Sequence, residues 1–217
     1  MSKITSVESQ KKNPRRFNIY LDGAFAFGAD EDLVVEYRLV PGKLLEESDV
    51  EKLLFEAEVG KLMERMYRLW NIRPRSEKEV RNYLRSLSFK RKVKDKEEIS
   101  EVVVELLIQK LRQKGMVDDE KFAKEWVRSK RISKYKGNRA ITAELLQKGV
   151  DRNIIIEALK GDGNQTELAE SALERKASKW KNLDSMEFRK KAYEFLMRRG
   201  FEYEVVKEVV ENLNKKK

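Results

Sequence analysis

The sequence predicts a mainly α-helical chain: tandem three-helix repeats in an elongated, curved array, preceded by a small N-terminal β-hairpin region. Apolar residues recur at helical spacing from about residue 48 onward. Strand-like alternation is confined to the first 30 residues or so, and a Gly followed by one apolar residue closes two helices at equivalent places. Three prolines and ten glycines in 217 residues are too few for an all-β chain.

The composition excludes several kinds of chemistry. The chain contains no cysteine and no histidine. Thiolate nucleophiles, disulfides, imidazole general bases and Cys/His metal sites are therefore excluded. We expect a protein that is not an enzyme and needs no cofactor or metal. The opening residues lack an apolar signal core, and no apolar run approaches the ~20 residues of a membrane span, so we expect a cytoplasmic protein without membrane contact.

Charge is distributed unevenly along the chain, whose formal net charge is +10. Residues 17–60 carry 11 acids and 3 bases, net −8, whereas residues 73–96 carry 10 bases and 3 acids, net +7. Residues 124–139 carry 7 bases and 1 acid, net +6. This asymmetry favours an anionic partner bound by one part of the molecule, although a solvated, lysine-rich helical surface explains it equally well.

We divide the chain into an N-terminal extension (residues 1–47) and three helical units (48–115, 116–160 and 161–217). In the extension, Ile4–Glu8 predicts a short strand, and the alternating residues on either side of Asp22-Gly23 predict a hairpin. The segment 30–39 forms either a helical turn or a strand, and Pro41-Gly42 ends it.

In the first helical unit, capping boxes at Ser48–Glu51 and Ser76–Glu79 predict two helix starts on either side of a break at residues 73–75. A third helix is expected from about Asp95 to Gly115. The second unit predicts helices near 119–134, 138–148 and 151–160, and the third near 166–181, 185–199 and 202–214.

The ends of the middle helices can be superposed. Leu145 is followed at the same offsets by Gly149 and Val150 as Leu196 is by Gly200 and Phe201. The apolar residues that follow also match, since Ile154, Ile155 and Ala158 correspond to Val205, Val206 and Val209. In the first unit the equivalent residues are Leu84, Ser88 and Phe89, with serine in place of glycine and a basic insert at 90–96. Stacked repeats present a long surface to a large partner, whereas an ordinary helical bundle would show such similarity only by chance.

Two blocks, GMVDDEKFAKEWVRSKR (115–131) and KGNRAITAELLQKGV (136–150), closely resemble the RecX family, regulators of the RecA recombinase. The segment RPRSEKEVRNYL (73–84) is similar to the first-unit signature of that family. The N-terminal hairpin resembles an extension found in part of the family, the third unit matches mainly through the repeat, and the insert at 90–96 departs from the pattern.

The resemblance implies a non-enzymatic protein that binds the groove of the RecA–DNA filament and limits filament growth, ATP hydrolysis and strand exchange. We therefore expect the RecA filament as a protein partner, single- or double-stranded DNA as a second partner, and a monomer. A general basic module that competes for DNA is the alternative. A hydrolase using carboxylates alone is a third reading, against which the missing histidine and cysteine argue.

Two basic clusters are the candidate partner-binding residues. The sharper one crosses the boundary between two predicted helices, with Tyr135 as a candidate for stacking on a base. Some of its cations would also favour a helix C-terminus, but six exceed that need. The other cluster is expected on the polar face of the helix after residue 75, where arginine suits bidentate contact with carboxylate or phosphate. The candidates are Arg128, Lys130, Arg131, Lys134, Tyr135, Lys136 and Arg139, and Arg73, Arg75, Arg81 and Arg85.

Three other motifs have structural explanations that we prefer. Asp118 and Asp119 resemble a metal-binding or acid–base pair, but a helix N-cap and a favourable dipole explain them better. Phe122 and Trp126 lie four residues apart on an apolar face, so core packing is favoured over base stacking. The loop 161–164 lacks the spacing of a calcium loop and reads as a linker.

Overall fold

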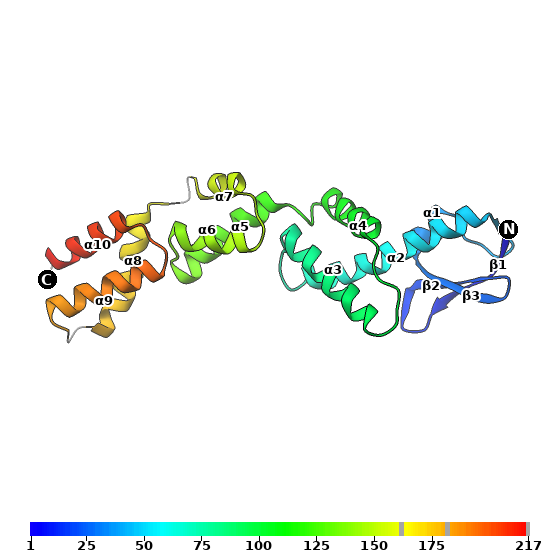
Figure 1. Cartoon of the computed structure of the whole chain (residues 1–217), viewed down its shortest axis with the longest axis horizontal. Coiled ribbons are helices and arrows are strands. Elements are labelled where there is room, and N and C mark those ends of the chain that lie inside the picture. The colour runs from blue at the N-terminus through cyan, green and yellow to red at the C-terminus, as the bar shows by residue number, and fades with distance from the viewer. Residues whose placement is uncertain (161–162, 181–182, 216–217) are drawn as a thin grey trace. The chain divides into compact units, whose positions relative to one another are not determined.

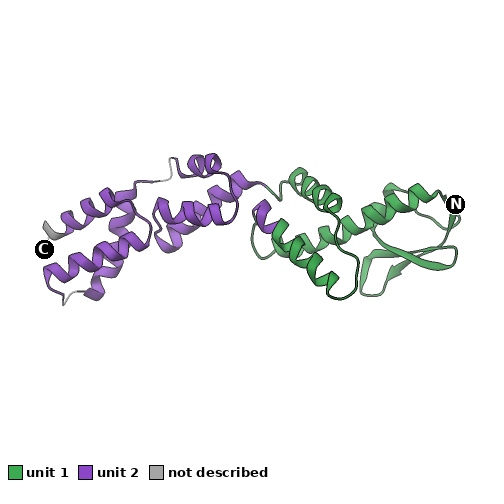
Figure 2. Cartoon of the chain, viewed as in Figure 1, with its two compact units in different colours: residues 1–75, 81–117 green, residues 76–80, 118–217 purple. Residues whose placement is uncertain are grey.

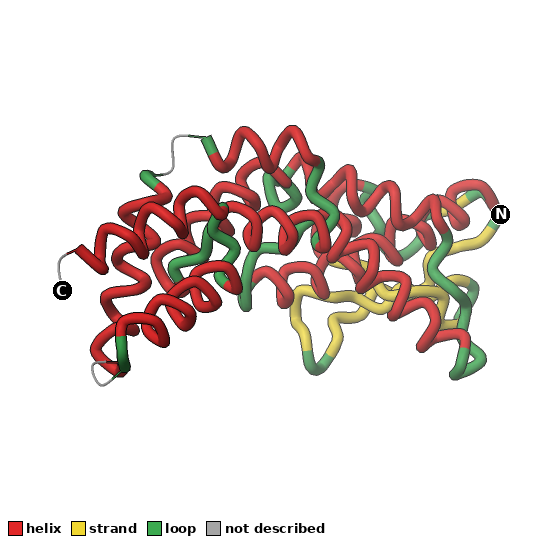
Figure 3. The backbone as a smooth tube through the Cα atoms, turned by 60° about the vertical axis from the view of Figure 1, so that its left-hand side comes forward, coloured by secondary structure: helices red, strands yellow, loops and turns green. Residues whose placement is uncertain are grey.

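The computed structural model describes residues 1–160, 163–180 and 183–215. Two compact units share the chain (Figure 2): the first comprises residues 1–75 and 81–117, and the second comprises 76–80 and 118–217. The strands lie in the first unit, whereas the described part of the second is built from helices (Figures 1 and 3). The mainly helical fold with a small N-terminal sheet is therefore confirmed.

The first unit begins with a four-stranded antiparallel sheet in the order β3-β2-β1-β4. Its strands are β1 (Ser2–Gln10), β2 (Asn13–Leu21), β3 (Ala24–Asp30) and the two-residue β4 (Leu44–Leu45). The predicted Asp22-Gly23 turn is confirmed, with φ of 49° and 86°, because both central residues of a type I′ turn need positive φ. Strand β1 is longer than expected, and nothing in the sequence pattern predicted β4.

Helix α1 (Glu31–Glu36) resolves the ambiguous segment after β3 as helical, with Asp30 as its N-cap. Helix α2 (Glu47–Trp70) follows β4 directly. The predicted capping box at Ser48–Glu51 is wrong, because Glu46 is the cap and its N–H donates to Asp49 Oδ2 at 3.1 Å. Since β4 pairs with β1 and ends at Leu45, the chain turns into the helix two residues earlier than the motif suggested.

Helix α3 (Glu77–Lys92) runs past the predicted stop at Ser88, so Phe89 lies inside a helix and is 65% exposed. Equating Leu84, Ser88 and Phe89 with the glycine closures was therefore wrong. Serine lacks the conformational freedom that lets glycine stop a helix at positive φ. Helix α4 (Glu101–Gln113) begins after Ser100, six residues later than predicted, because the Ser100 side chain accepts the N–H of Val103. The capping box of Ser76 with Glu79 is confirmed.

The second unit contains two groups of helices at nearly the predicted positions. The first group is α5 (Asp119–Lys134), α6 (Asn138–Gln147) and α7 (Arg152–Leu159). The second is α8 (Gln165–Ala177) with a short 3-10 turn (Ser178–Trp180), α9 (Ser185–Arg198) and α10 (Tyr203–Lys215). Each group has its own buried core. Part of the predicted linker, residues 161 and 162, lies outside the described residues.

The repeated glycine closure is confirmed at two helix ends. Gly149 and Gly200 have φ of 80° and 82°, and the residue after each donates its N–H to the carbonyl five positions back. These bonds join Val150 to Leu145 (3.1 Å) and Phe201 to Leu196 (3.3 Å). The geometry is a Schellman motif, in which the apolar residue after the glycine folds back onto the helix. The curvature of the array and its division at residues 47, 115 and 160 remain predictions.

Candidate partner-binding surface

The boundary between α5 and α6 carries the sharper of the two predicted clusters. Helix α5 ends because Tyr135 adopts a left-handed conformation with φ of 48°. Gly137 then caps α6 with an extended backbone, and its N–H donates to the carbonyl of Arg199 at 2.9 Å. The N–H of Arg139 donates to the carbonyl of Gly200 at 3.0 Å. The predicted boundary between the two helices is thus hydrogen-bonded to the end of α9.

Arg131 does not lie on the expected basic surface. Its residue exposure is 6%, and Nη2 donates to Asn138 Oδ1 at 3.0 Å. Asn138 in turn uses its backbone N–H to reach Gln165 Oε1 at 3.2 Å. Arg131 therefore supports the structure between α5, α6 and α8, because its position on α5 turns inward beside Val127 instead of toward solvent.

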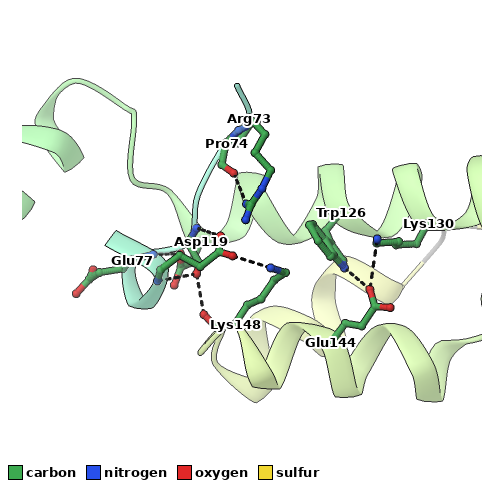
Figure 4. A network of polar contacts seen from close by, with 10 residues as sticks. Arg73, Pro74, Glu77, Asp119, Trp126, Lys130, Glu144 and Lys148 are labelled. Atoms are coloured by element: carbon green, nitrogen blue, oxygen red, sulfur yellow. Dashed lines mark hydrogen bonds and ion pairs between the residues drawn. The ribbon is translucent and has the colours of Figure 1, made fainter. Parts of the chain in front are cut away.

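Lys130 and Lys136 are engaged by a carboxylate on α6, Glu144. Lys136 forms an ion pair with Glu144 Oε1, and Lys130 Nζ lies 3.7 Å from Oε2. The indole N–H of Trp126 donates to the same carboxylate at 2.9 Å, as Figure 4 shows. Lys130 Nζ also lies 4.2 Å from the centre of the Trp126 ring. Two of the predicted partner-binding cations are thus held by one acid.

Lys148 extends this network at the C-terminal end of α6. Its Nζ lies 4.3 Å from the centre of the Trp126 ring and 2.7 Å from Glu79 Oε1. The Ser76 hydroxyl donates to the Lys148 carbonyl at 2.7 Å. The N–H of Glu77 donates to Asp119 Oδ1 at 3.0 Å (Figure 4). These contacts join residues 76–80 to the rest of the second unit.

Glu144 is expected to make the free energy of unfolding of the second unit depend on pH. Burial raises the pKa of this carboxyl, but hydrogen bonds from Lys136 and Trp126 outweigh burial and lower the pKa below its usual range. Because the folded-state pKa is depressed, the contribution is complete above the unfolded-state pKa and is lost as pH falls through the lower folded-state value.

We expect Glu144→Gln to reduce the free energy of unfolding at neutral pH by about 1–2 kcal/mol, since charge-assisted hydrogen bonds are lost. The difference from wild type should shrink as pH falls below about 4.3, the unfolded-state pKa of a glutamate, and then through the lower folded-state pKa at which Glu144 becomes protonated. Urea unfolding across pH 3–7 measures both effects. A constant difference over that range would contradict the role given to the charge, and Glu157→Gln, in an exposed pair with Lys160, is the matched control.

Three cations of the sharper cluster stay exposed: Arg128, Lys134 and Arg139. None of them forms an ion pair within the described residues. Tyr135 is half-buried, packs against the core of the α8–α10 group and accepts a hydrogen bond from Arg175 Nη1 at 3.0 Å. The candidate surface on this cluster therefore contains fewer available cations than the sequence suggested.

The other predicted cluster is not a continuous helical face. Arg73 and Arg75 precede α3, and Arg73 Nη1 donates to the neighbouring carbonyl of Pro74 at 2.9 Å. Arg81 donates two hydrogen bonds to the Glu105 carboxylate, at 2.5 and 3.0 Å. Arg85 alone is an exposed arginine on α3. The expectation that all four lie on the polar face of one helix was wrong, because the helix begins at Glu77.

The structural explanations of the acidic pair and of the aromatic pair on α5 are confirmed. Asp118 caps α5 by accepting the N–H of Lys121 at 2.9 Å, and Asp119 lies in the first turn. Phe122 is buried and stacks on Trp126, with ring centres 5.6 Å apart. The described residues contain no group of three or more acidic side chains placed to hold a metal ion.

Sequence reasoning missed the residues that organise this surface. Glu144 was not singled out, and Glu79 was predicted only as a capping residue, although each forms an ion pair with a lysine. Arg199 was also missed. Its carbonyl accepts the N–H of Gly137 before α6, and its guanidinium lies over the ring of Phe195 on α9. The available signal for Glu144 was that it is a single acid about two helical turns after Lys136. Spacing along the chain does not show which cation on another element an acid will contact.

Comparison with known proteins identifies the family. Models of RecX domains match three parts of the chain: the N-terminal domain of the regulatory protein at residues 2–46, the second three-helix domain at 118–159 and the third at 164–210. Regulatory protein RecX of Bacillus subtilis is 32% identical over 212 residues, covering 97% of this chain and 76% of that protein. The chain belongs to the RecX family.

Other RecX proteins agree with this assignment. The regulatory protein RecX of Listeria monocytogenes is 30% identical over 207 residues, covering 94% of this chain and 73% of that protein. A crystal structure of regulatory protein RecX is 27% identical, with a TM-score of 0.72 over 96% of this chain and 98% of that one. RecX from Lactobacillus salivarius, 24% identical with a TM-score of 0.61, shares the fold over 72% of this chain and 97% of that one. In the described part of this RecX family member, no helix is long and apolar enough to cross a membrane.

Proposed function

We propose that this chain is a non-enzymatic regulator that binds the RecA–DNA filament and restrains its growth, ATP hydrolysis and strand exchange. Membership of the RecX family is the observation that carries the proposal. The RecA contact is what resemblance to that family implies. A chain without histidine or cysteine, built mainly from helices, suits a role in binding.

Within this proposal, Arg128 and Lys134 are the cations to place against the filament. Both are exposed on α5 and have no ion pair in the described part of the chain. Arg131 is unsuitable for such a test because it is buried, so its replacement would disturb the fold. Replacing the exposed Arg128 and Lys134 instead should change binding without changing the stability of the fold.

The test is the single-stranded-DNA-dependent ATPase of RecA, measured while the protein is titrated in. Inhibition well below one molecule per RecA protomer would support action on filament growth. The variant Arg128→Glu with Lys134→Glu should require about tenfold more protein for half-inhibition, because like charges then face the partner. Lys190→Glu with Lys191→Glu, exposed on α9, makes the same change in net charge and should behave as wild type. Equal effects of the two double variants would contradict this contact surface.

The net charge of +10 favours a second candidate, a general nucleic-acid-binding module. Each phosphate neutralised on duplex DNA contributes about −0.9 to the slope of log affinity against log salt. Under this alternative, inhibition of RecA would appear only at concentrations that coat the DNA and would fade steeply with salt. A flat response on naked DNA would exclude it.

A further inference from the structure

Helix α2 lines a groove in the first unit. Leu53 and Ala57 of this helix pack into the core beneath the sheet, and α2 also contacts α4. A groove of about 760 Å³ lies beside these contacts, lined by residues of β3, α2 and the segment 97–100 before α4. All the lining residues belong to the first unit. The volume lies within the range of protein sites that take up ligands.

Five of the lining residues form one stripe along α2. They are spaced by four, three, four and three residues, which follows the helical period of 3.6, so their side chains project from the same face. The stripe begins with an apolar residue that is 44% exposed and ends with three cations. Its members, in chain order, are Leu54, Glu58, Lys61, Arg65 and Arg68.

Strand β3 runs in the same direction as α2, which fixes the order of residues along the groove. Asp30, at the end of β3, lies directly against Gly60 in the middle of α2. Strand β4, which leads into α2, pairs with the start of β1, and Ala24 begins β3 at this same end of the sheet. Phe25 therefore lies toward the N-terminal part of α2, the part that contains Leu54.

The N-terminal part of the groove is apolar and open. Phe25 is 59% exposed, and its ring centre lies 5.9 Å from that of Tyr20 in an edge-to-face arrangement. The half-buried Phe55 lines the same groove. Single exposed apolar residues are ordinary on protein surfaces, but Phe25 and Leu54 are exposed together in one groove. A bulky apolar side chain of a ligand could bury surface on both.

Several acids of the groove already have cationic partners. The guanidinium of the buried Arg16 also donates to the Gly28 carbonyl at 3.0 Å, so this part of the groove wall is fixed before any ligand binds. These acids therefore leave the three cations of the stripe without a counter-ion. The ion pairs are Arg16–Glu64 at 3.0 Å, Arg91–Glu58 at 2.6 Å and Lys92–Glu98 at 2.7 Å.

The cations of the stripe are available to a ligand. Lys61, Arg65 and Arg68 form no ion pair among the residues that the structure describes, and Lys61 and Arg68 are exposed. Two exposed acids, Glu51 and Glu97, also line the groove. A nucleic acid carries a phosphate at every nucleotide and would bring some of them near these acids. A peptide can place its carboxylates beside the cations alone.

We propose that this groove binds a short acidic peptide segment of a partner protein. A bulky apolar side chain of the segment lies against Phe25 and Leu54, and its carboxylates pair with Lys61, Arg65 and Arg68. A rise of 1.5 Å per residue places these cations about 10–21 Å from Leu54 along α2, a span that about three to six residues of an extended peptide cover. The proposal goes beyond the regulation of RecA and does not depend on it.

Fluorescence anisotropy with a labelled synthetic peptide tests the groove. The peptide carries a Phe-Leu pair, two glycines and four glutamates, and it is used in both chain directions. Lys61→Glu with Arg68→Glu should weaken binding about tenfold, because like charges then face the acids. Leu54→Ser should weaken it about fivefold through lost apolar burial. Lys190→Glu with Lys191→Glu makes the same change in net charge on the exposed face of α9 and should bind as wild type.

A peptide with glutamine in place of glutamate gives a second readout that needs no protein variant. It should bind wild type about tenfold more weakly and should not respond to Lys61→Glu with Arg68→Glu. Circular dichroism shows that the protein variants remain folded. Equal binding of the two peptides, or equal losses from the α2 and α9 double variants, would overturn the proposal.

Two further measurements identify other occupants of the groove. Displacement of the labelled peptide by oligo-dT as readily as by unlabelled peptide would overturn the proposal in favour of nucleic acid. A dimer in sedimentation that dissociates in the Leu54→Ser variant would overturn it in favour of a second copy of the chain. Loss of peptide binding by the α2 double variant, with inhibition of the RecA ATPase intact, would show that the groove is separate from the filament contact.

Discussion

Gly200→Ala is expected to reduce the free energy of unfolding by about 2–5 kcal/mol. A non-glycine residue in the left-handed region costs about 1–2 kcal/mol, and forcing a methyl group into a packed contact adds about 1–3 kcal/mol. Gly200 has φ of 82°, and its added Cβ would meet the nitrogen, Cβ and Cα of Ala140 at 2.3, 2.4 and 2.8 Å. Backbone atoms of a neighbouring helix cannot move aside as a flexible side chain would.

Gly163→Ala is the matched control within the same unit. Gly163 has φ of 87°, but the atom nearest to its added Cβ is Arg131 Nη1 at 3.8 Å, an ordinary contact distance. This variant should therefore show the backbone strain alone, about 1–2 kcal/mol. Urea unfolding of the two variants separates the cost of the left-handed conformation from the cost of the close contact. Equal losses of stability would mean that the contact between α6 and α9 contributes nothing beyond the conformation of the glycine.

Phe201→Ala should cost about 3–5 kcal/mol of unfolding free energy, the range for truncating a fully buried aromatic residue. Phe201 is 0% exposed and lies in the core formed by α8, α9 and α10, directly after the glycine that stops α9. The hydrogen bond from the Phe201 N–H to the Leu196 carbonyl places the ring beneath the C-terminal end of α9. Truncation leaves a cavity that the surrounding backbone cannot fill.

Phe89→Ala tests the same substitution at the position that the repeat pattern equated with Phe201. Phe89 is 65% exposed on α3, so its removal should change stability by less than about 0.5 kcal/mol. Thermal and urea unfolding of both variants measure the contrast. A large loss for Phe89→Ala would show that α3 is closed by a buried apolar residue, as α6 and α9 are.

The helices of the second unit could be predicted within a few residues because their signals are local. Asp118 is a cap, Gly149 is a stop, and apolar residues repeat with the period of a helix. The Asp22-Gly23 turn was equally readable, since its chemistry requires only its own two residues. The first unit was less predictable. Glu46 replaced Ser48 as a cap because the pairing of β4 with β1 decided where the helix could begin.

The candidate surface shows the same division. The sequence by itself determined the fold class, the family and the presence of a basic cluster between α5 and α6. Only the tertiary structure decided which cations are exposed, because burial and pairing depend on residues far away in the chain. Glu144 forms ion pairs with Lys130 and Lys136, Asn138 accepts a hydrogen bond from Arg131, and the end of α9 contacts the boundary between α5 and α6. A charge pattern records how many cations a segment has, whereas their availability is set by the acids and carbonyls that folding brings beside them.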